Sequence, residues 1–387
     1  MVSGVKSRLG TLLVVVVSTV LAVLVAEGAL RLVLNPADFL QATLVDDPVL
    51  GRRIAPFATG HDALGFRNRE VPARASIVAI GDSFTYGVNA PREGSWPQQL
   101  SGLLGESVYN MGLGGFGPLQ YLQLAQVTAK PLNPRLWVVG FYFGNDLMDA
   151  YYVAHGTPYW HPWRLSNGVL AGPDAVDRAA SEAPRKRFQG VRDWLSRNSL
   201  LYSVLRATVL KPLAAREREQ MVRQAAPDVQ WSWSDPANGD VRTVFTSQSR
   251  LAVVNLETDR VSEGMKISQR ALSTLQSEAD RHGVKLLVVL IPTKERAFCT
   301  YLRQTRASLP ASHDKLCDAE AQAKAELMRS LDASKIRFVD PTDALEEKIA
   351  QHVTLYPADS DGHFLAAGYG VVAQVVADAI RHVAPKP

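Results

Sequence analysis

Short continuous apolar runs alternate with longer amphipathic segments along most of the chain. Five runs predict strands: residues 76–80, 107–110, 136–142, 285–291 and 337–340, of which 107–110 and 337–340 are short. The apolar run at 76–80 is of the type buried on both faces of a parallel sheet. Helical periodicity is present at residues 96–104, 119–129, 262–282, 318–331 and 366–383. Because strands that alternate with helices form a parallel sheet with helices on both faces, the pattern predicts an α/β domain over residues 76–387.

The first 34 residues have a different pattern and predict a membrane anchor. Lys6 and Arg8 precede an uncharged apolar run from Leu9 to Ala26, which is long enough to cross a bilayer as a helix. A clean cleavage site is missing after the run. We therefore favour an uncleaved anchor over the two alternatives, a cleaved signal peptide and a buried helix. Positive charge before the run places the N-terminus in the cytoplasm. We therefore expect a single-pass protein of the cytoplasmic (inner) membrane, with its catalytic domain on the extracytoplasmic, periplasmic side.

Two segments depart from the strand–helix alternation. Residues 35–75 are rich in turns and proline, which predicts a linker and an extended segment. Residues 150–260 are rich in Trp, Tyr, Arg and Pro and predict an insert or cap, with one helix expected around 188–209. The aromatic residues at 151–152 and 159–163 could stack on sugar rings or pack in the core of the insert, and packing is the commoner use.

Composition narrows the classes of function more than it narrows the fold. The 387 residues carry a formal net charge of +4, and no dense Lys/Arg stripe indicates a nucleic-acid partner. The two cysteines, Cys299 and Cys317, are not spaced as a redox pair, and no His/Cys cluster predicts a metal site. In an oxidising compartment they could form a disulfide; two free thiols are the other interpretation, and the sequence leaves both open.

Ser83 is the first candidate for chemistry. It lies in Gly81-Asp82-Ser83-Phe84, directly after the strand expected at 76–80. A tight strand-to-helix turn there would project the hydroxyl at the edge of the sheet, and the following helix N-terminus would favour developing negative charge. The same tripeptide could be an ordinary Asp–Ser helix cap. By itself the motif does not separate a nucleophile from a cap.

Turns after the next two expected strands carry groups that can hold an oxyanion. The turn from Asn110 to Gly117 is rich in glycine, which allows a free backbone N–H to approach a substrate oxygen. It lacks the Gly-Lys-Ser/Thr ending of a phosphate loop. Asn145 follows the third expected strand, and its amide can donate to an oxyanion or cap a helix. Because ligands of parallel sheets bind beyond the carboxyl ends of the strands, the three turns are expected at one edge.

His363 is the candidate base. It stands directly before the last expected helix, in the run Asp359-Ser360-Asp361-Gly362-His363. A neutral imidazole can take a serine proton when a carboxylate fixes its tautomer, and two aspartates lie within reach along the chain. A lone histidine is more often structural, so the position of His363 beside two acids is what raises it to a candidate.

These four short runs, in this order, resemble the SGNH (GDSL-type) hydrolase family over about residues 76–383, apart from the insert. Residues 62–68 and 291–295 also look like the membrane-anchored, envelope-associated branch of that family. The resemblance implies a five-stranded, flavodoxin-like α/β/α sandwich. It also implies roles for individual residues: Ser83 as nucleophile and oxyanion donor, Gly115 or its neighbour Gly114 as second donor, Asn145 as third donor, and His363 as base.

The sequence departs from the family pattern at two places. The fourth signature usually has Asp three residues before His, where Ser360 stands here. Asp361 is the expected acid because some envelope acetyltransferase relatives use its spacing, and Asp359 is the alternative. The third block reads Gly-Asn-Asp without the usual spacer before Asn145.

The resemblance implies a serine-dependent acyl-ester hydrolase that acts outside the cytoplasm and needs no metal or organic cofactor. One alternative is an O-acetyltransferase that modifies a cell-surface polysaccharide. An alternative of another class is a non-catalytic, glycan-binding envelope scaffold. The expected partners are an acyl-ester substrate, with a glycan as the alternative acceptor, and the membrane through the N-terminal helix.

Overall fold

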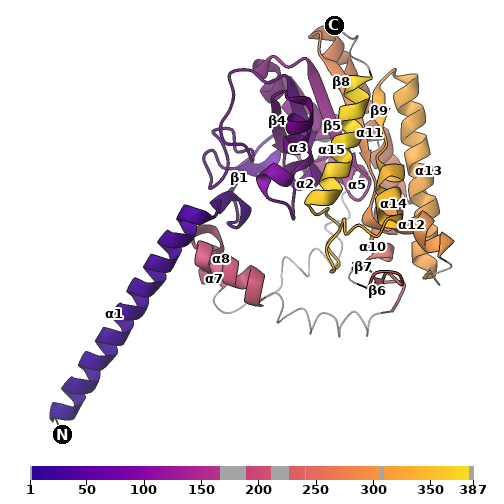
Figure 1. Cartoon of the computed structure of the whole chain (residues 1–387). Coiled ribbons are helices and arrows are strands. Elements are labelled where there is room, and N and C mark those ends of the chain that lie inside the picture. Colours follow the sequence, from indigo (N-terminus) through magenta and orange to yellow (C-terminus); the bar gives the residue numbers. More distant parts are fainter. Residues whose placement is uncertain (1, 166–188, 211–225, 240, 306–308, 383–387) are drawn as a thin grey trace.

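A five-stranded sheet with all strands parallel forms the centre of the molecule (Figure 1). The computed structural model describes residues 2–165, 189–210, 226–239, 241–305 and 309–382. The strand order is β4-β3-β5-β8-β9. The strands are β3 (Ile77–Gly81), β4 (Val108–Gly112), β5 (Leu136–Tyr142), β8 (Lys285–Ile291) and β9 (Arg337–Val339). All five predicted strands are therefore present, with small shifts at their ends.

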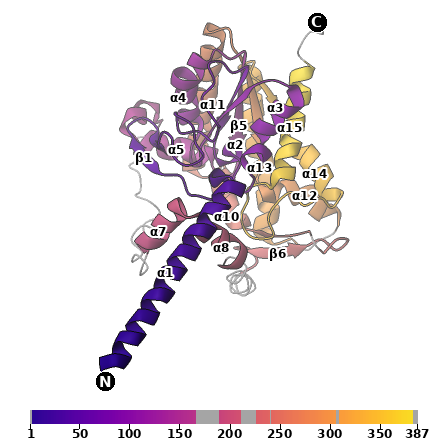
Figure 2. The same cartoon turned by 60° about the vertical axis from the view of Figure 1, so that its left-hand side comes forward.

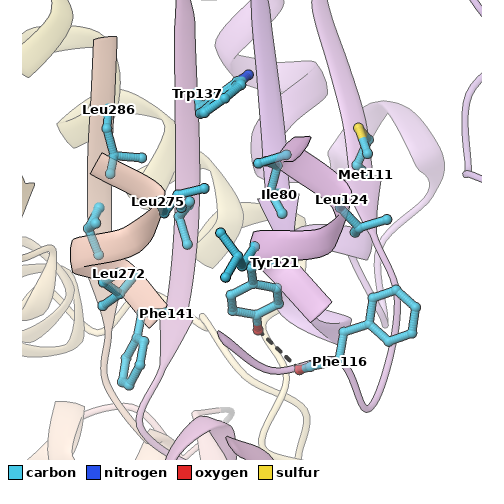
Figure 3. Close-up of a cluster of buried hydrophobic side chains, with 14 of the residues drawn as sticks. Ile80, Met111, Phe116, Tyr121, Leu124, Trp137, Phe141, Leu272, Leu275 and Leu286 are labelled. Carbon is cyan, nitrogen blue, oxygen red and sulfur yellow. Dashed lines mark hydrogen bonds between the residues drawn. The ribbon is translucent and has the colours of Figure 1, made fainter. Parts of the chain in front are cut away.

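The strands carry apolar residues at nearly every position because both faces of the sheet are covered. Ile80, Trp137 and Leu286 point to one face of the sheet (Figure 3). There they belong to one cluster of buried hydrophobic side chains, to which four helices also contribute. Those helices are α4 (Pro118–Leu124), α5 (Asp146–Gly156), α11 (Asp259–Arg281) and α13 (Ala311–Ala333).

The residues between them point to the opposite face. There Ala79, Val138 and Val289 belong to a second cluster. Its helices are α3 (Trp96–Leu104), α12 (Lys294–Gln304), α14 (Thr342–Ala350) and α15 (Ala366–Arg381). The period-2 alternation of side chains thus divides each apolar strand between two helical layers, and the predicted three-layer α/β/α sandwich is confirmed.

Helix α1 (Val2–Val33) is continuous and projects away from the body (Figures 1 and 2). Its segment Gly10–Val33 has 24 residues, a mean hydropathy of 2.5 and no buried part. A helix of this length and composition near the N-terminus fits a single-pass anchor or a signal. It is followed by η1 (Pro36–Asp38) and the antiparallel hairpin of β1 (Leu44–Asp47) and β2 (Gly51–Ile54).

The insert contains more elements than the sequence pattern indicated. The single helix expected at 188–209 is wrong, because the chain breaks at Ser199, whose hydroxyl accepts from the Tyr202 backbone N–H at 3.1 Å and caps a second helix. The described elements are η5 (Pro158–Trp163), α7 (Gln189–Asn198), α8 (Leu200–Leu205), η6 (Arg206–Leu210), β6 (Trp231–Ser234), β7 (Arg242–Phe245) and α10 (Ser247–Val254). Residues 166–188 and 211–225, which the sequence also assigned to the insert, lie outside the described residues.

Short elements elsewhere complete the chain. The helix expected at 119–129 ends as α4 at Leu124 and continues as a π-helical turn. The sequence pattern did not identify α2, α12 or α14. The remaining short elements are α2 (Ser83–Tyr86), η2 (Arg92–Gly94), η3 (Ala125–Ala129) and η4 (Lys130–Leu132).

The aromatic residues of the insert serve mainly as core. Trp160 is buried, and its indole N–H donates to the Val49 carbonyl at 2.7 Å. Tyr151 is buried and stacks on His155 with ring centroids 4.3 Å apart. Tyr159 is exposed. Packing therefore accounts for the buried pair, as aromatic side chains usually require.

Cys299 on α12 and Cys317 on α13 form a disulfide. This decides between the two interpretations that the sequence left open. His313 lies close to both sulfur atoms, but its Nδ1 is 2.9 Å from the Ser247 hydroxyl and the sulfurs are bonded to each other. The three residues therefore offer a metal no free thiolate.

Three glycines form a row across the sheet beneath α2. Gly81 of β3 pairs in register with Gly112 of β4 and with Gly140 of β5. A Cβ at Gly112 would lie 2.1 Å from the Tyr86 backbone nitrogen, and one at Gly140 would lie 2.6 Å from the Thr85 hydroxyl. The first turn after β3 therefore sits directly on the sheet backbone, which only glycine permits at these positions.

We expect Gly112→Ala to destabilise the protein and to lower its activity. The added methyl must displace the α2 backbone, and overpacking of this kind costs about 1–3 kcal/mol. Urea unfolding in detergent micelles, together with an ester-hydrolysis rate, measures both effects. Gly102→Ala is the matched control, because nothing lies within 4 Å of a Cβ there. Equal stability of the two variants would contradict the close packing.

Candidate active site

Ser83 is the first residue of α2, directly beyond the carboxyl end of β3. The preceding residue, Asp82, caps this helix by accepting from the Phe84 backbone N–H at 2.8 Å. The cap predicted as an alternative role for this tripeptide is therefore present, but it is made by Asp82. The Ser83 hydroxyl does not cap the helix, but it lies within hydrogen-bond distance of Asp82 Oδ2, at 3.3 Å.

Ser83, His363 and Asp361 are hydrogen-bonded in series. The Ser83 Oγ lies 2.8 Å from His363 Nε2, and His363 Nδ1 lies 2.7 Å from Asp361 Oδ1. Ser83 and His363 are 280 positions apart in the chain. In this arrangement Nδ1 carries its proton toward the carboxylate, which leaves Nε2 able to accept the serine proton.

The two candidate acids have different roles in the loop between α14 and α15. Asp361 also accepts from the His363 backbone N–H at 3.0 Å. Asp359 accepts from the Asp361 backbone N–H at 2.9 Å and is exposed. Partial burial raises the pKa of Asp361, but the hydrogen bonds from His363 lower it further, so its pKa lies below its ordinary value and it is ionised near neutral pH. Geometry thus favours Asp361 over Asp359 as the partner of His363.

The other predicted residues also lie at this edge of the sheet. Asn145 follows β5 and donates a side-chain hydrogen bond to Asp82; because an amide has two N–H groups, one remains for another acceptor. In the glycine turn after β4, Gly115 has a positive φ of 79°. A Cβ at Gly114 would lie 3.6 Å from the Ser83 Cβ, whereas one at Gly115 would lie against Arg52. Of the two glycines, Gly114 is thus the one whose missing side chain would face Ser83.

Three acids lie under the site: Asp82 and Asp146 are buried, and Asp149 is half-buried. Asp82 is fully buried, and burial raises its pKa to about 6. Burial also raises the pKa of Asp146 and Asp149, and the charge on Asp82 raises both further. Asp146 accepts from the Tyr121 hydroxyl at 2.9 Å and from the Tyr142 backbone N–H at 3.0 Å. Burial therefore disfavours the ionised form of Asp82, the residue directly before Ser83.

We expect Asp82→Asn to remove a pH dependence of stability. Between the usual pKa of 3.8 and about 6, the folded protein keeps a proton on Asp82 that the unfolded chain has lost. The free energy of unfolding of the wild type, relative to the variant, should therefore fall by about 2 kcal/mol from pH 4 to pH 7. Urea denaturation at both pH values tests this. Asp359→Asn changes an exposed residue and is the control: its free energy of unfolding should change with pH as that of the wild type does. If the free energy of unfolding of Asp82→Asn also changes in parallel with the wild type, the expectation is refuted.

Lys294 holds the loop that carries the predicted base and acid. It is completely buried, and its Nζ donates to the carbonyls of Val244, Asp359 and Asp361 at 2.7, 3.1 and 3.0 Å. Burial lowers its pKa to about 8. The sequence singled out residues 291–295 only as a resemblance and assigned Lys294 no role, because a lysine normally predicts an exposed position.

Arg250 supports the neighbouring loop from α10. Its Nη1 donates to the Gly144 carbonyl at 3.3 Å, and a Cβ at Gly362 would lie 3.1 Å from its Nη2. It therefore stands between the turn that carries Asn145 and the loop that carries His363. The sequence contained no local signal for Arg250, since it lies in the insert far from every motif.

Residues 245–387 match the family model described as "SGNH hydrolase-like domain, acetyltransferase AlgX". This segment includes β8, β9, Asp361 and His363. Ser83, Asn145 and the glycine turn precede the matched segment. No curated protein matches the chain significantly.

Solved structures of several hydrolases are similar to the chain. A catalytic mutant of Axe2, an acetylxylan esterase from Geobacillus stearothermophilus, is 10% identical, with a TM-score of 0.38, and the match covers 80% of this chain and 95% of that one. LAE5, an alpha/beta hydrolase enzyme from the metagenome of Lake Arreo, Spain, is 12% identical, with a TM-score of 0.38 and coverage of 81% and 99%. Likeness at this distance assigns no function by itself.

Proposed function

We propose that this chain, a member of the SGNH hydrolase-like enzymes that act on acyl esters, works through an acyl-enzyme on Ser83. The observation that carries the proposal is the series of hydrogen bonds from Ser83 through His363 to Asp361. A base within 2.8 Å of the hydroxyl, itself held by a carboxylate, is the arrangement that activates a serine nucleophile.

The first half of the reaction follows from these positions. His363 Nε2 removes the proton as Ser83 Oγ forms a bond to the acyl carbon. Asp361 stabilises the imidazolium that results and keeps Nδ1 protonated. When the tetrahedral intermediate collapses, the bond to the alcohol oxygen breaks, and the proton on Nε2 passes to the leaving alcohol. The acyl group is then an ester of Ser83.

The negative charge on the acyl oxygen needs donors at the same edge of the sheet. We assign this role to the Ser83 backbone N–H, to the glycine turn at Gly114 and Gly115, and to the Asn145 amide. Of the two glycines, Gly114 is the one at which an added Cβ would face Ser83, 3.6 Å from its Cβ. Donors held in place before the reaction stabilise the transition state without reorganisation.

In the second half, a hydroxyl attacks the acyl carbon while His363 Nε2 takes its proton. The bond from the acyl carbon to Ser83 Oγ then breaks, and the proton on Nε2 returns to Ser83. Water as acceptor makes the protein an esterase. A sugar hydroxyl makes it an O-acetyltransferase for a cell-surface polysaccharide, and the description of the matched family model as an acetyltransferase favours this second function. The hydrogen-bond series serves both reactions equally.

We further propose that the reaction occurs outside the cytoplasm, with the chain anchored by α1. The apolar helix Gly10–Val33 and the positive charge before it support this orientation. The disulfide between Cys299 and Cys317 supports it independently, because disulfides persist in oxidising compartments.

A single assay separates the two acceptors. The purified full-length protein in detergent micelles is given p-nitrophenyl acetate, with and without an oligosaccharide acceptor, and acetate and acetylated sugar are both measured. Release of p-nitrophenol that depends on Ser83 supports the acyl-enzyme. Acetyl on the sugar in preference to free acetate identifies a transferase, and free acetate alone identifies an esterase. Absence of p-nitrophenol release would contradict the proposed function.

A further inference from the structure

The outer end of α1 reaches beyond the hydrocarbon core of a bilayer. Gly10–Val33 has 24 residues, which at 1.5 Å per residue gives a helix of about 36 Å. The hydrocarbon core of a bilayer is about 30 Å thick. The uncharged run Leu9–Ala26 has 18 residues and is about 27 Å long, which by itself nearly spans that core. With this run in the hydrocarbon core, the following turns of α1, which carry the charged residues Glu27 and Arg31, lie at the level of the lipid headgroups.

Helices α7 and α8 are fixed to α1 at that level. We call α7, α8 and η6, residues 189–210, the interfacial hairpin. Glu27 accepts from the Ser199 hydroxyl and from the backbone N–H groups of Leu200 and Leu201, each at 2.9 Å. Arg31 donates to Glu27 at 2.8 Å and to the Asn198 carbonyl at 2.6 Å. The first backbone N–H groups of α8 therefore donate to the side chain of Glu27, a residue of α1.

The hairpin is also joined to the folded body. The Gln41 backbone N–H donates to the Ser196 carbonyl at 3.0 Å, and Leu200 is fully buried. In both views the hairpin lies beside the end of α1 that meets the body (Figures 1 and 2). Its height relative to a membrane is therefore set by α1 and shared with the body.

Large apolar side chains on the hairpin are exposed. Trp194 of α7 is 61% exposed, although it is the kind of residue that cores usually bury. The other exposed apolar residues of the hairpin are Val191, Leu205, Val209 and Leu210. Val191, Trp194 and Leu195 follow the i, i+3, i+4 spacing of one helix face.

Exposed arginines accompany these apolar residues. Arg192, Arg197 and Arg206 are exposed, and the acidic residue among them is the half-buried Asp193. Trp with Arg on a short amphipathic helix is the composition of segments that lie in the membrane interface, where the ring enters the headgroup layer and the cation meets lipid phosphates. Leu32, near the end of α1, is also 90% exposed.

We propose that the interfacial hairpin lies in the outer headgroup layer of the bilayer that α1 spans, with Trp194 and Leu205 in contact with lipid. This rests on the anchoring of α1 proposed above. The hairpin holds the folded body, with the edge of the sheet that carries Ser83, at a fixed height over the membrane. A protein tethered by α1 alone would have no such fixed height.

Site-directed spin labels measure this directly. The full-length protein is reconstituted into vesicles of phosphatidylcholine and phosphatidylglycerol, and a nitroxide is attached to one introduced cysteine at a time. The native cysteines are paired in the disulfide and do not react without reductant. The variants are Leu21→Cys in α1, Trp194→Cys and Leu205→Cys in the hairpin, and Val127→Cys in η3 of the body. Leu21 and Val127 are 61% and 60% exposed, which matches Trp194.

We expect labels at 194 and 205 to collide more with oxygen, which concentrates in lipid, and less with a water-soluble nickel chelate than the label at 127. The label at 21 should be the most shielded from nickel. If the label at 21 is in lipid while those at 194 and 205 are as accessible to nickel as the one at 127, the hairpin is not interfacial although the anchor is. If the label at 21 is itself in water, the anchor fails and this proposal fails with it.

Discussion

Ser83→Ala should abolish both ester cleavage and labelling by a fluorophosphonate probe. The probe transfers its phosphonyl group to an activated serine oxygen and releases fluoride, so it reports the nucleophile independently of the substrate. Without the Ser83 Oγ, no acyl-enzyme can form, although the proposed base and oxyanion donors remain. We expect a loss in kcat/KM for p-nitrophenyl acetate of at least about 10⁴-fold.

Ser360→Ala is the matched control for this change. Ser360 is exposed in the same loop as His363, so its loss should leave both labelling and rate within a few-fold of wild type. Labelling of the wild type but not of Ser83→Ala would exclude the alternative that the protein is a non-catalytic, glycan-binding scaffold. If the wild type does not label, or if Ser83→Ala keeps its label, the proposed nucleophile is wrong.

Asp361→Asn should lower kcat by about 10³- to 10⁴-fold, while Asp359→Asn should have little effect. The asparagine at 361 can still accept from the His363 backbone N–H, so the loop is retained. It carries no charge to stabilise the imidazolium, and its N–H₂ favours the wrong tautomer of His363. At 359 the side-chain oxygen accepts from the Asp361 backbone N–H, and asparagine accepts equally well.

Steady-state rates with p-nitrophenyl acetate compare the two variants, and circular dichroism verifies that both are folded. The size of the difference is the informative quantity, because the two aspartates stand two residues apart in one loop. A larger loss for Asp359→Asn than for Asp361→Asn would assign the acid to the other residue. Equal and small losses would mean that His363 does not depend on a carboxylate.

Parts of the fold were predictable from local sequence because their cause is local. An apolar run such as 285–291 predicts a buried strand without reference to any partner, and β8 has those bounds. The helix at 96–104 was equally clear from its periodicity. The helix at 188–209 was not, because a single hydroxyl at Ser199 ends one helix and caps the next. The pattern also missed α14 (Thr342–Ala350), although this helix is as long as the one at 96–104.

The candidate site divides in the same way. The sequence by itself determined that Ser83, Asn145 and His363 were the residues to examine, because the ends of parallel strands converge at one edge whatever the loops contain. Only the tertiary structure placed Asp361, and not Asp359, beside His363 Nδ1, brought the turn of Gly114 near Ser83, paired Cys299 with Cys317, and buried Lys294 against the loop of His363. Each of these depends on distances of a few ångströms between groups whose positions local sequence does not encode.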